Sequence, residues 1–263
     1  MKRVLAAVAV LTGLCLAGIA QADTVLITGS NRGIGFEFAK QYAEQGWYVI
    51  ATSRSPADDT DLKALAAAHR NITIEKLDLL DINGINALAD KYKGKPIDLL
   101  INNAGVLGDA EGQTLGTLDY ETFAKVFGTN VFGTLAVTQA FKDNVIASTQ
   151  KKIVALTSIA GSVAVAGAAP NNPYFYRASK AAMHMGMRAV AADLKSQGVI
   201  VGIIGPGSVV TSMYEQYGED YGFTDPNAIT PAQSVGLMMD IIAGLDQSSN
   251  SKLINSDGKT YPF

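Results

Sequence analysis

The chain has 263 residues, of which 48% are hydrophobic, and its formal net charge is −3. This acidic balance excludes the basic surface that nucleic-acid binding requires, so we expect no nucleic-acid partner. The length and composition predict a single domain with one sizeable core. Its two histidines, His69 and His184, lie far apart with no cysteine near them, so we expect no metal site.

The first 22 residues have the pattern of a secretory signal peptide. A positively charged start precedes an apolar run from Val4 to Ile19, and Ala20 and Ala22 supply the small residues that signal peptidase reads. The run is shorter than the roughly 20 residues that span a bilayer comfortably. We therefore predict cleavage after Ala22, export to a bacterial periplasm, and no stable membrane insertion of the mature chain. A membrane tether stays open, as does a cytoplasmic protein whose leader is misread.

Apolar runs of strand length alternate with helical periods along the rest of the chain. The runs are Val25–Thr28, Tyr48–Ser53, Ile72–Lys76, Ile97–Ile101, Lys152–Thr157, Val199–Ile204 and a short one near Leu253. Repeated strand-helix-strand units require right-handed crossovers and a mainly parallel sheet. The pattern predicts a single α/β domain over residues 23–263, with a doubly wound sheet of about seven strands and helices on both faces.

A glycine-rich turn follows the first predicted strand and precedes a helical period from Phe36 to Gln45. Gly29, Gly33 and Gly35 allow a tight turn and a close approach of the backbone to a ligand. Free amides at the start of a helix attract a pyrophosphate, so the segment predicts a dinucleotide site. The spacing differs from the usual dinucleotide fingerprint by one extra residue between the first two glycines.

The end of the second predicted strand indicates which dinucleotide the site would prefer. An enzyme that prefers NAD carries an acidic residue there, whereas this chain has Ser53 followed by Arg54. A guanidinium binds a 2′-phosphate through bidentate hydrogen bonds, and Arg32 adds a second positive charge. We therefore predict NADP (NADPH) in preference to NAD. The nearby acidic cluster that contains Asp59 opens the next predicted helix, where it interacts favourably with the helix dipole.

Tyr176 and Lys180 are four residues apart, so they lie one turn from each other on the same face of a predicted helix. A free phenol has a pKa of about 10, and a nearby ammonium lowers that pKa toward the working pH of a general acid or base. The pair predicts a proton donor together with the group that tunes it.

With these motifs the chain resembles the classical short-chain dehydrogenases/reductases, from Thr24 nearly to the C-terminus. Asn102-Asn103-Ala104-Gly105 matches the family's Asn-Asn-Ala-Gly signature, and Pro206-Gly207 with Thr211 matches its segment beside the nicotinamide. Within the family the chain is most similar to the C-factor-like carbonyl reductases, on its last eight residues and the sequence after Tyr176. The resemblance implies a Rossmann fold.

The resemblance also implies a set of site residues. The catalytic residues would be Asn130, Ser158, Tyr176 and Lys180. The residues that bind the cofactor would be Gly29, Ser30, Arg32, Gly33, Ile34, Gly35, Arg54, Asp78, Leu79, Asn102, Ala104, Gly105, Tyr176, Lys180, Pro206, Gly207 and Thr211. Asn130 would position a water that passes protons to Lys180. Family members commonly pair through the helices that hold Asn130 and Tyr176, so a homo-oligomer stays open.

Two serines compete for the catalytic position. Ser158 ends the apolar strand run and precedes an Ala-Gly pair, as in the family, but its distance from Tyr176 is longer than usual. Ser162 fits the usual spacing better. We favour Ser158, because loops tolerate insertions at low cost whereas the carboxyl end of a strand is held where α/β sheets bind their ligands. Ser162 stays the alternative.

Together these features predict an NADP-dependent carbonyl reductase or alcohol dehydrogenase that acts on a small apolar substrate. In reduction, Tyr176 would donate a proton to the developing alkoxide while Ser158 holds the oxygen. The aromatic-rich segment 208–227 would form the substrate loop. A non-catalytic NADP-binding signalling protein is the alternative. A nucleotide-sugar epimerase or dehydratase fits less well, because the chain after Pro206 is too short for its larger C-terminal substrate domain.

Overall fold

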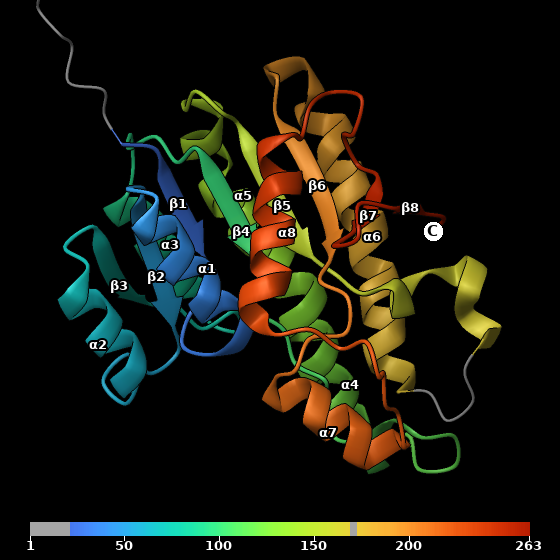
Figure 1. Ribbon diagram of the computed structural model, residues 1–263. Helices are drawn as coiled ribbons and strands as arrows, with labels where there is room; N and C mark the ends of the chain where they lie inside the picture. Colours follow the sequence, from blue (N-terminus) through green and yellow to red (C-terminus); the bar gives the residue numbers. More distant parts are fainter. Residues whose placement is uncertain (1–21, 169–172) are drawn as a thin grey trace, which may run out of the picture.

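The computed structural model describes residues 22–168 and 173–263 of the chain (Figure 1). The predicted signal peptide therefore lies outside the described residues, apart from Ala22. Among the helices of the described part, none combines the length and the apolar character that a membrane-spanning helix needs. The described residues form the predicted single α/β domain.

One sheet of eight strands runs through the domain in the order β3-β2-β1-β4-β5-β6-β7-β8. The strands are β1 Thr24–Ile27, β2 Tyr48–Ser53, β3 Ile72–Lys76, β4 Leu99–Asn102, β5 Lys152–Leu156, β6 Ile200–Gly205, β7 Leu253–Asn255 and β8 Thr260–Tyr261. All neighbours pair in parallel except β7 and β8, which are antiparallel. The eighth strand was not predicted, because two residues are too few to show a strand pattern in sequence.

Helices connect the strands. The α-helices are α1 Gly33–Glu44, α2 Thr60–Ala68, α3 Ile82–Lys91, α4 Tyr120–Phe127, α5 Thr134–Ile146, α6 Tyr174–Leu194, α7 Ser212–Tyr221 and α8 Pro231–Ala243. A π-helical turn, η2 (Gly128–Gly133), joins α4 to α5. Short 3₁₀ turns are η1 Glu111–Gln113, η3 Ile159–Gly161, η4 Val163–Ala168 and η5 Lys195–Gln197.

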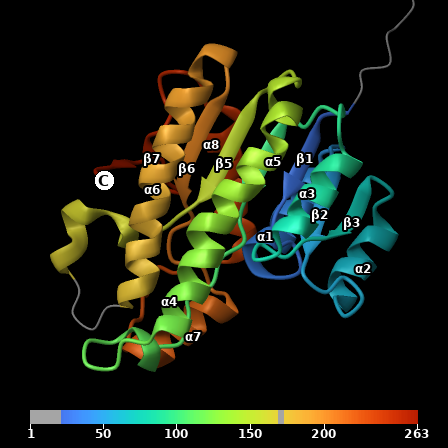
Figure 2. The same cartoon turned by 180° about the vertical axis from the view of Figure 1, so that it is seen from behind.

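The sheet is covered on both faces, as the near-continuous apolar runs of its strands predict. Helices α1, α2 and α8 pack on one face (Figure 1), and α3, α5 and α6 pack on the other (Figure 2). Successive residues of a strand point to opposite faces, so Leu26 joins the second layer while Val25 and Ile27 join the first. Each layer has its own buried cluster, with Phe38 in one and Phe141 in the other.

The strand order reverses between β1 and β4, which are neighbours in the sheet but lead to opposite edges. From β1 the chain proceeds outward to β2 and β3, whereas from β4 it proceeds outward to β5 and β6. Loops at the carboxyl ends of β1 and β4 therefore separate and leave a crevice. In doubly wound sheets, ligands bind at this position.

Candidate active site

A cleft of about 410 Å³ occupies the carboxyl end of the sheet at this reversal. Residues that follow β1, β2, β3, β4, β5 and β6 line it, together with the first turns of α6 and α7. The glycine turn, Arg54, Tyr176 and Lys180 all contribute to its walls. The fold thus brings together motifs that lie far apart in the sequence.

The glycine turn has two positions at which its geometry favours glycine. Gly29 has a φ of +68°, in the left-handed region. A Cβ atom on Gly35 would lie 2.1 Å from the carbonyl oxygen of Gly29, so a side chain there would collide with the backbone. Because Gly35 has no side chain, the start of α1 can pack directly against the backbone of Gly29.

This turn directs the start of α1 into the cleft. Gly33 and Ile34, the first residues of α1, both line the cleft. Within the described chain, the side chain of Arg32 at the N-cap makes no hydrogen bond to the first amides of the helix. Uncapped amides with a positive helix end favour an anion, so the cleft fits the pyrophosphate of a dinucleotide.

The glycine turn is fastened to the end of β4 by Asn103. Its Nδ2 donates to the carbonyl oxygens of Thr28 at 2.8 Å and Gly29 at 2.9 Å. In return, the Thr28 hydroxyl oxygen accepts hydrogen bonds at 3.0 Å from the amides of Asn103 and Ala104. Our cofactor list omitted Asn103, although it lies between two residues that we named. Its polar side chain directly after a buried strand was the signal that could have found it.

Three residues predicted to bind the cofactor are not among those that line the cleft, and their part in binding it stays a prediction. Ser30 is fully buried, with its hydroxyl donating to Ile27 and its amide donating to Thr52. The Asn102 amide points into the sheet's other layer and donates to Thr138 on α5 at 3.0 Å. Gly207 turns toward β7, where a Cβ would lie 2.9 Å from the Ser256 hydroxyl oxygen.

The remaining cofactor positions from the sequence analysis line the cleft. These are Gly29, Arg32, Gly33, Ile34, Gly35, Arg54, Asp78, Leu79, Ala104, Gly105, Tyr176, Lys180, Pro206 and Thr211. Further residues that line the cleft, which the sequence analysis did not assign to the cofactor site, are Asn31, Ser53, Asp59, Lys125, Ser212 and Met213. They come from β2, α4, α7 and the loops after β1 and β2, and only the fold brings these segments to one cleft.

Tyr176 and Lys180 lie one turn apart on α6, as predicted, with the Lys180 ammonium 5.7 Å from the centre of the tyrosine ring. The Lys180 Nζ donates to the carbonyl oxygen of Leu156, the last residue of β5, at 3.1 Å. This bond anchors the lysine to the sheet. Because the lysine is buried, its pKa falls to about 8.

The pKa of Tyr176 differs from our expectation. Burial raises it to about 12, Ser158 lowers it through a hydrogen bond, and the charge of Tyr217 raises it. We expected Lys180 to lower the pKa below the ordinary value, but the desolvation of the phenol outweighs any such effect in this cleft. The phenol is therefore protonated at neutral pH, which is the state that a proton donor needs.

The two candidate serines have different surroundings. Ser158 follows β5, accepts a hydrogen bond from the Ala160 amide at 3.1 Å, and interacts with the Tyr176 hydroxyl. Ser162 is buried, and its hydroxyl donates to the carbonyl oxygen of Pro262 at 2.7 Å. Ser158 thus lies beside the tyrosine, whereas Ser162 holds the C-terminal segment.

Asn130 lies in the π-helical turn between α4 and α5. Its Oδ1 accepts from the Val106 amide at 2.8 Å, and its Nδ2 donates to the Val106 carbonyl and to the Ser179 hydroxyl. Asn130 and Lys180 both lie against Gly105. A Cβ on Gly105 would lie 3.2 Å from the Asn130 Oδ1 and 3.6 Å from the Lys180 Nζ. Asn130 therefore braces the loop after β4 against α6 beside the lysine.

Aromatic rings from α7 and the loop after it pack together, and one of them, Tyr217, lies near Tyr176. Tyr217 packs against Tyr221 with ring centres 5.1 Å apart, and against Phe223 at 5.4 Å. Tyr217 is close enough to raise the pKa of Tyr176. From the same helix, Gln216 donates to the Gly108 carbonyl at 3.3 Å, which ties α7 to the loop after β4. These rings lie within the predicted substrate loop, 208–227.

The opposite end of the cleft carries charged side chains. Arg32 and Arg54 are exposed there. Asp59, the residue before α2, bonds through its carboxylate to the hydroxyl of Ser53 and, at 3.2 Å, to the side-chain amide of Asn31. We expected this acidic cluster to interact with the helix dipole. For Asp59 the structure shows a different contact, because the loop after β2 folds its carboxylate back to the strand end.

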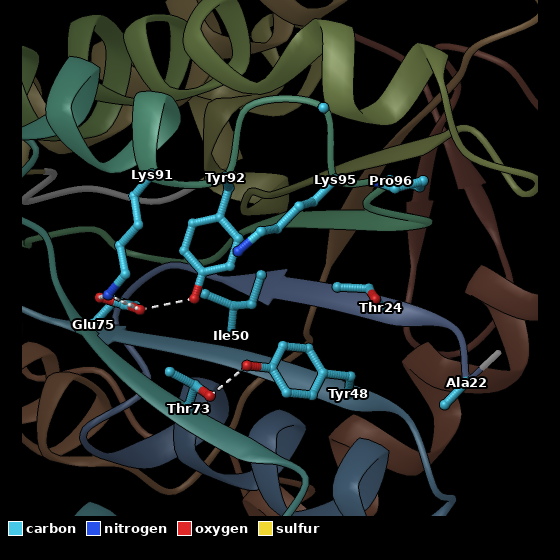
Figure 3. A pocket seen from close by; sticks show the side chains of 11 residues that line it. Ala22, Thr24, Tyr48, Ile50, Thr73, Glu75, Lys91, Tyr92, Lys95 and Pro96 are labelled. Atoms are coloured by element: carbon cyan, nitrogen blue, oxygen red, sulfur yellow. Dashed lines mark hydrogen bonds and ion pairs between the residues drawn. The ribbon is translucent and has the colours of Figure 1, made fainter.

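A second cavity, of about 610 Å³, is lined by residues of β1, β2 and β3 and by the segment 91–96 at the end of α3 (Figure 3). Its polar side chains are largely paired with one another. Glu75 accepts from Lys91 at 2.6 Å and from the Tyr92 hydroxyl at 2.7 Å, and Tyr48 bonds to Thr73. None of the residues predicted for the site lines this cavity.

Comparisons with known proteins agree with this arrangement. The family model described as short chain dehydrogenase matches residues 23–222. An uncharacterised oxidoreductase of Schizosaccharomyces pombe is 32% identical over 249 residues, which cover 90% of this chain and 96% of that protein. The C-signal protein of Myxococcus xanthus is 33% identical over 180 residues, covering 68% of this chain and all of that protein.

Solved structures show the same fold with a dinucleotide bound. The NADPH-bound carbonyl reductase from chicken fatty liver superposes with a TM-score of 0.82 at 28% identity, covering 92% of this chain and 100% of that one. An NADP-bound short-chain dehydrogenase/reductase from Burkholderia multivorans gives a TM-score of 0.78 at 26% identity, with the same coverage.

Proposed function

Because the chain belongs to the short-chain dehydrogenase family, we propose that it transfers a hydride between NADP(H) and the carbonyl or secondary alcohol of a small apolar molecule. One observation carries this proposal. The uncapped start of α1 lines the same cleft as Tyr176 and Lys180, and Ser158 interacts with Tyr176. A dinucleotide bound in this cleft would place its phosphates at the helix start and its reactive ring near the tyrosine.

The residues that line the cleft fit each part of the cofactor. Gly33 and Ile34 would bind the pyrophosphate with their amides. Asp78 and Leu79 would contact the adenine, and Pro206 with Thr211 would lie beside the nicotinamide, as the family resemblance implies. When bound, the cofactor supplies or accepts the hydride. Lys180 would hold the nicotinamide ribose.

The protein's own groups move and hold the proton. In reduction, the protonated Tyr176 hydroxyl would donate to the oxygen of the substrate as negative charge develops there. The Ser158 hydroxyl would hold the same oxygen by a hydrogen bond. Lys180, anchored to Leu156, would favour the phenolate left after transfer by its positive charge. Asn130 holds the loop after β4 in place beside Lys180. In this position it would help to bring protons from solvent to the lysine.

Two further features support finer parts of the proposal. The exposed guanidiniums of Arg32 and Arg54 favour the 2′-phosphate of NADP. The rings of Tyr217, Tyr221 and Phe223 favour an apolar substrate, because they pack together and Tyr217 brings this aromatic cluster near Tyr176. The wild-type chain and the Arg54→Gln variant can be compared for NADPH affinity to test the first point.

The first experiment is a turnover assay. The purified chain is mixed with NADPH and a panel of aldehydes, ketones and quinones, and the loss of NADPH absorbance is followed. We expect turnover with at least one compound and a loss of about 10³-fold in kcat for Tyr176→Phe, because the proton donor is removed. NADPH binding to the variant, measured by fluorescence, should be unchanged. Equal turnover by Tyr176→Phe would eliminate the proposed mechanism, and binding without turnover on any compound would favour a non-catalytic NADP-binding role.

Export of the chain is a separate proposal that rests on residues 1–22 alone. The positive start, apolar run and small residues before Asp23 have the order that signal peptidase recognises. Amino-terminal sequencing of the protein recovered from a periplasmic extract should begin at Asp23. Recovery of the intact chain from the cytoplasmic fraction would overturn the proposal.

A further inference from the structure

The Asp59 carboxylate takes an unusual position at the adenosine end of the cleft. It interacts with the Ser53 hydroxyl at the end of β2 and with the Asn31 amide in the glycine turn, and all three residues line the cleft. Asp59 belongs to a different segment, the loop that leads into α2. This loop therefore places the negative charge of Asp59 at the end of β2, where the strand itself ends in the neutral Ser53.

Asp59 takes this position instead of capping its own helix. It is the N-cap residue of α2, and aspartate is among the preferred residues there because its carboxylate can accept from the first free amides. Among the described residues, however, its carboxylate bonds to Ser53 and Asn31 and to no amide of the first turn of α2. Because the Asp59 carboxylate bonds to residues of the cleft and not to the amides of its own helix, we infer that its role lies in the cleft.

The surroundings of Asp59 define what it can bind. A carboxylate between the glycine turn and the end of β2 lies where the ribose next to adenine is bound in doubly wound folds. It accepts hydrogen bonds from ribose hydroxyls, and it repels a phosphate on the same ribose. Arg32 and Arg54 on the rim of the same end act in the opposite sense, because they attract the phosphate.

We propose that Asp59 is a cofactor-discriminating residue that favours NADH and opposes the 2′-phosphate of NADPH, so that the chain accepts both cofactors. This inference rests on the proposed dinucleotide binding. The two arginines alone would give a strong preference for NADPH. With Asp59 in place, we expect the dissociation constants for NADPH and NADH to lie within about tenfold of each other.

The test measures binding rather than turnover. Dissociation constants of NADPH and NADH are determined by fluorescence titration for the wild-type chain and for Asp59→Asn, which removes the charge and keeps the side-chain size. The matched control is Asp58→Asn, because Asp58 is the exposed neighbour and carries the same charge. Thermal unfolding confirms that each variant is folded, and Asp59→Ala provides a second replacement if Asp59→Asn is not.

We expect Asp59→Asn to raise the preference for NADPH over NADH by about tenfold, with most of the change in tighter NADPH binding. The increase should shrink at high salt, because exposed charges are screened. Asp58→Asn should change the preference by less than about twofold. An unchanged preference in Asp59→Asn, or an equal change in Asp58→Asn, would overturn the role of Asp59. Failure of the wild-type chain to bind either cofactor would instead overturn the proposed function.

Discussion

The two ends of the cleft are built in different ways. At the catalytic end, Tyr176 and Lys180 share one helix, and the lysine is buried and bonded to the strand end at Leu156. At the adenosine end, Arg32 and Arg54 are exposed side chains on loops. Under the proposed function, a desolvated frame would hold the groups that move the proton, whereas the choice of cofactor would depend on charges that water partly screens.

The same difference predicts how strongly each end responds to substitution. A group at the buried end acts at low effective dielectric and cannot be replaced by water. A charge at the open end is weakened by solvent and salt. Substitutions at the catalytic end should therefore change turnover by orders of magnitude, and substitutions at the adenosine end should change affinity modestly.

The largest change in turnover that we expect within this comparison comes from the two candidate serines. Ser158→Ala should lower kcat by about 10²-fold, because it removes a hydroxyl that would hold the substrate oxygen beside Tyr176. Ser162→Ala is the matched control. It should leave kcat within about threefold and instead lower the melting temperature, because a buried hydrogen bond to Pro262 is lost. Steady-state kinetics and thermal unfolding of both variants measure this, and a larger loss of kcat in Ser162→Ala would reverse our assignment.

The next effect concerns pH. Burial lowers the pKa of Lys180 from 10.5 to about 8, so the ammonium loses its proton as the pH rises through about 8. Tyr176, with a pKa of about 12, stays protonated over the same range. The rate of carbonyl reduction should therefore be level below pH 7 and about tenfold lower at pH 9, because each unit above the pKa removes most of the remaining ammonium.

A Lys180→Arg variant tests whether deprotonation of Lys180 causes the fall in the reduction rate above pH 8. Arginine keeps its charge throughout the range, so the variant should be slower but should lose the fall in rate above pH 8. The pH profile of kcat for both proteins provides the measurement. A fall that persists unchanged in Lys180→Arg would assign the titration to another group.

The smallest effect belongs to the adenosine end. Arg54→Gln should weaken NADPH binding by about fivefold and leave NADH binding nearly unchanged, because an exposed guanidinium contributes a screened interaction with the 2′-phosphate. Arg70→Gln is the control, since Arg70 is an exposed arginine before the amino end of β3, whereas Arg54 follows the carboxyl end of β2. Fluorescence titration at low and moderate salt measures both. An equal weakening of NADH binding would show that Arg54 does not recognise the phosphate.

Much of the molecule follows from the sequence alone. The alternation of apolar runs and helical periods predicted the order of the strands in the chain and a parallel, doubly wound sheet, because buried parallel strands must be apolar on both faces. The spacing of Tyr176 and Lys180 predicted their common helix face, since the period of a helix is local. The glycine turn predicted the start of α1 in the same way.

Other features were decided only when distant segments came together. Asn102 and Asn103 are neighbours of the same type, and the packing against α5 and the glycine turn determines which one faces the cleft. The pKa of Tyr176 rises rather than falls because burial, which no local pattern encodes, outweighs the lysine. Asp59 could cap its own helix or contact Ser53, and the fold selects the second. Local periods are set by backbone geometry, whereas solvent exposure and the competition between polar partners depend on tertiary packing.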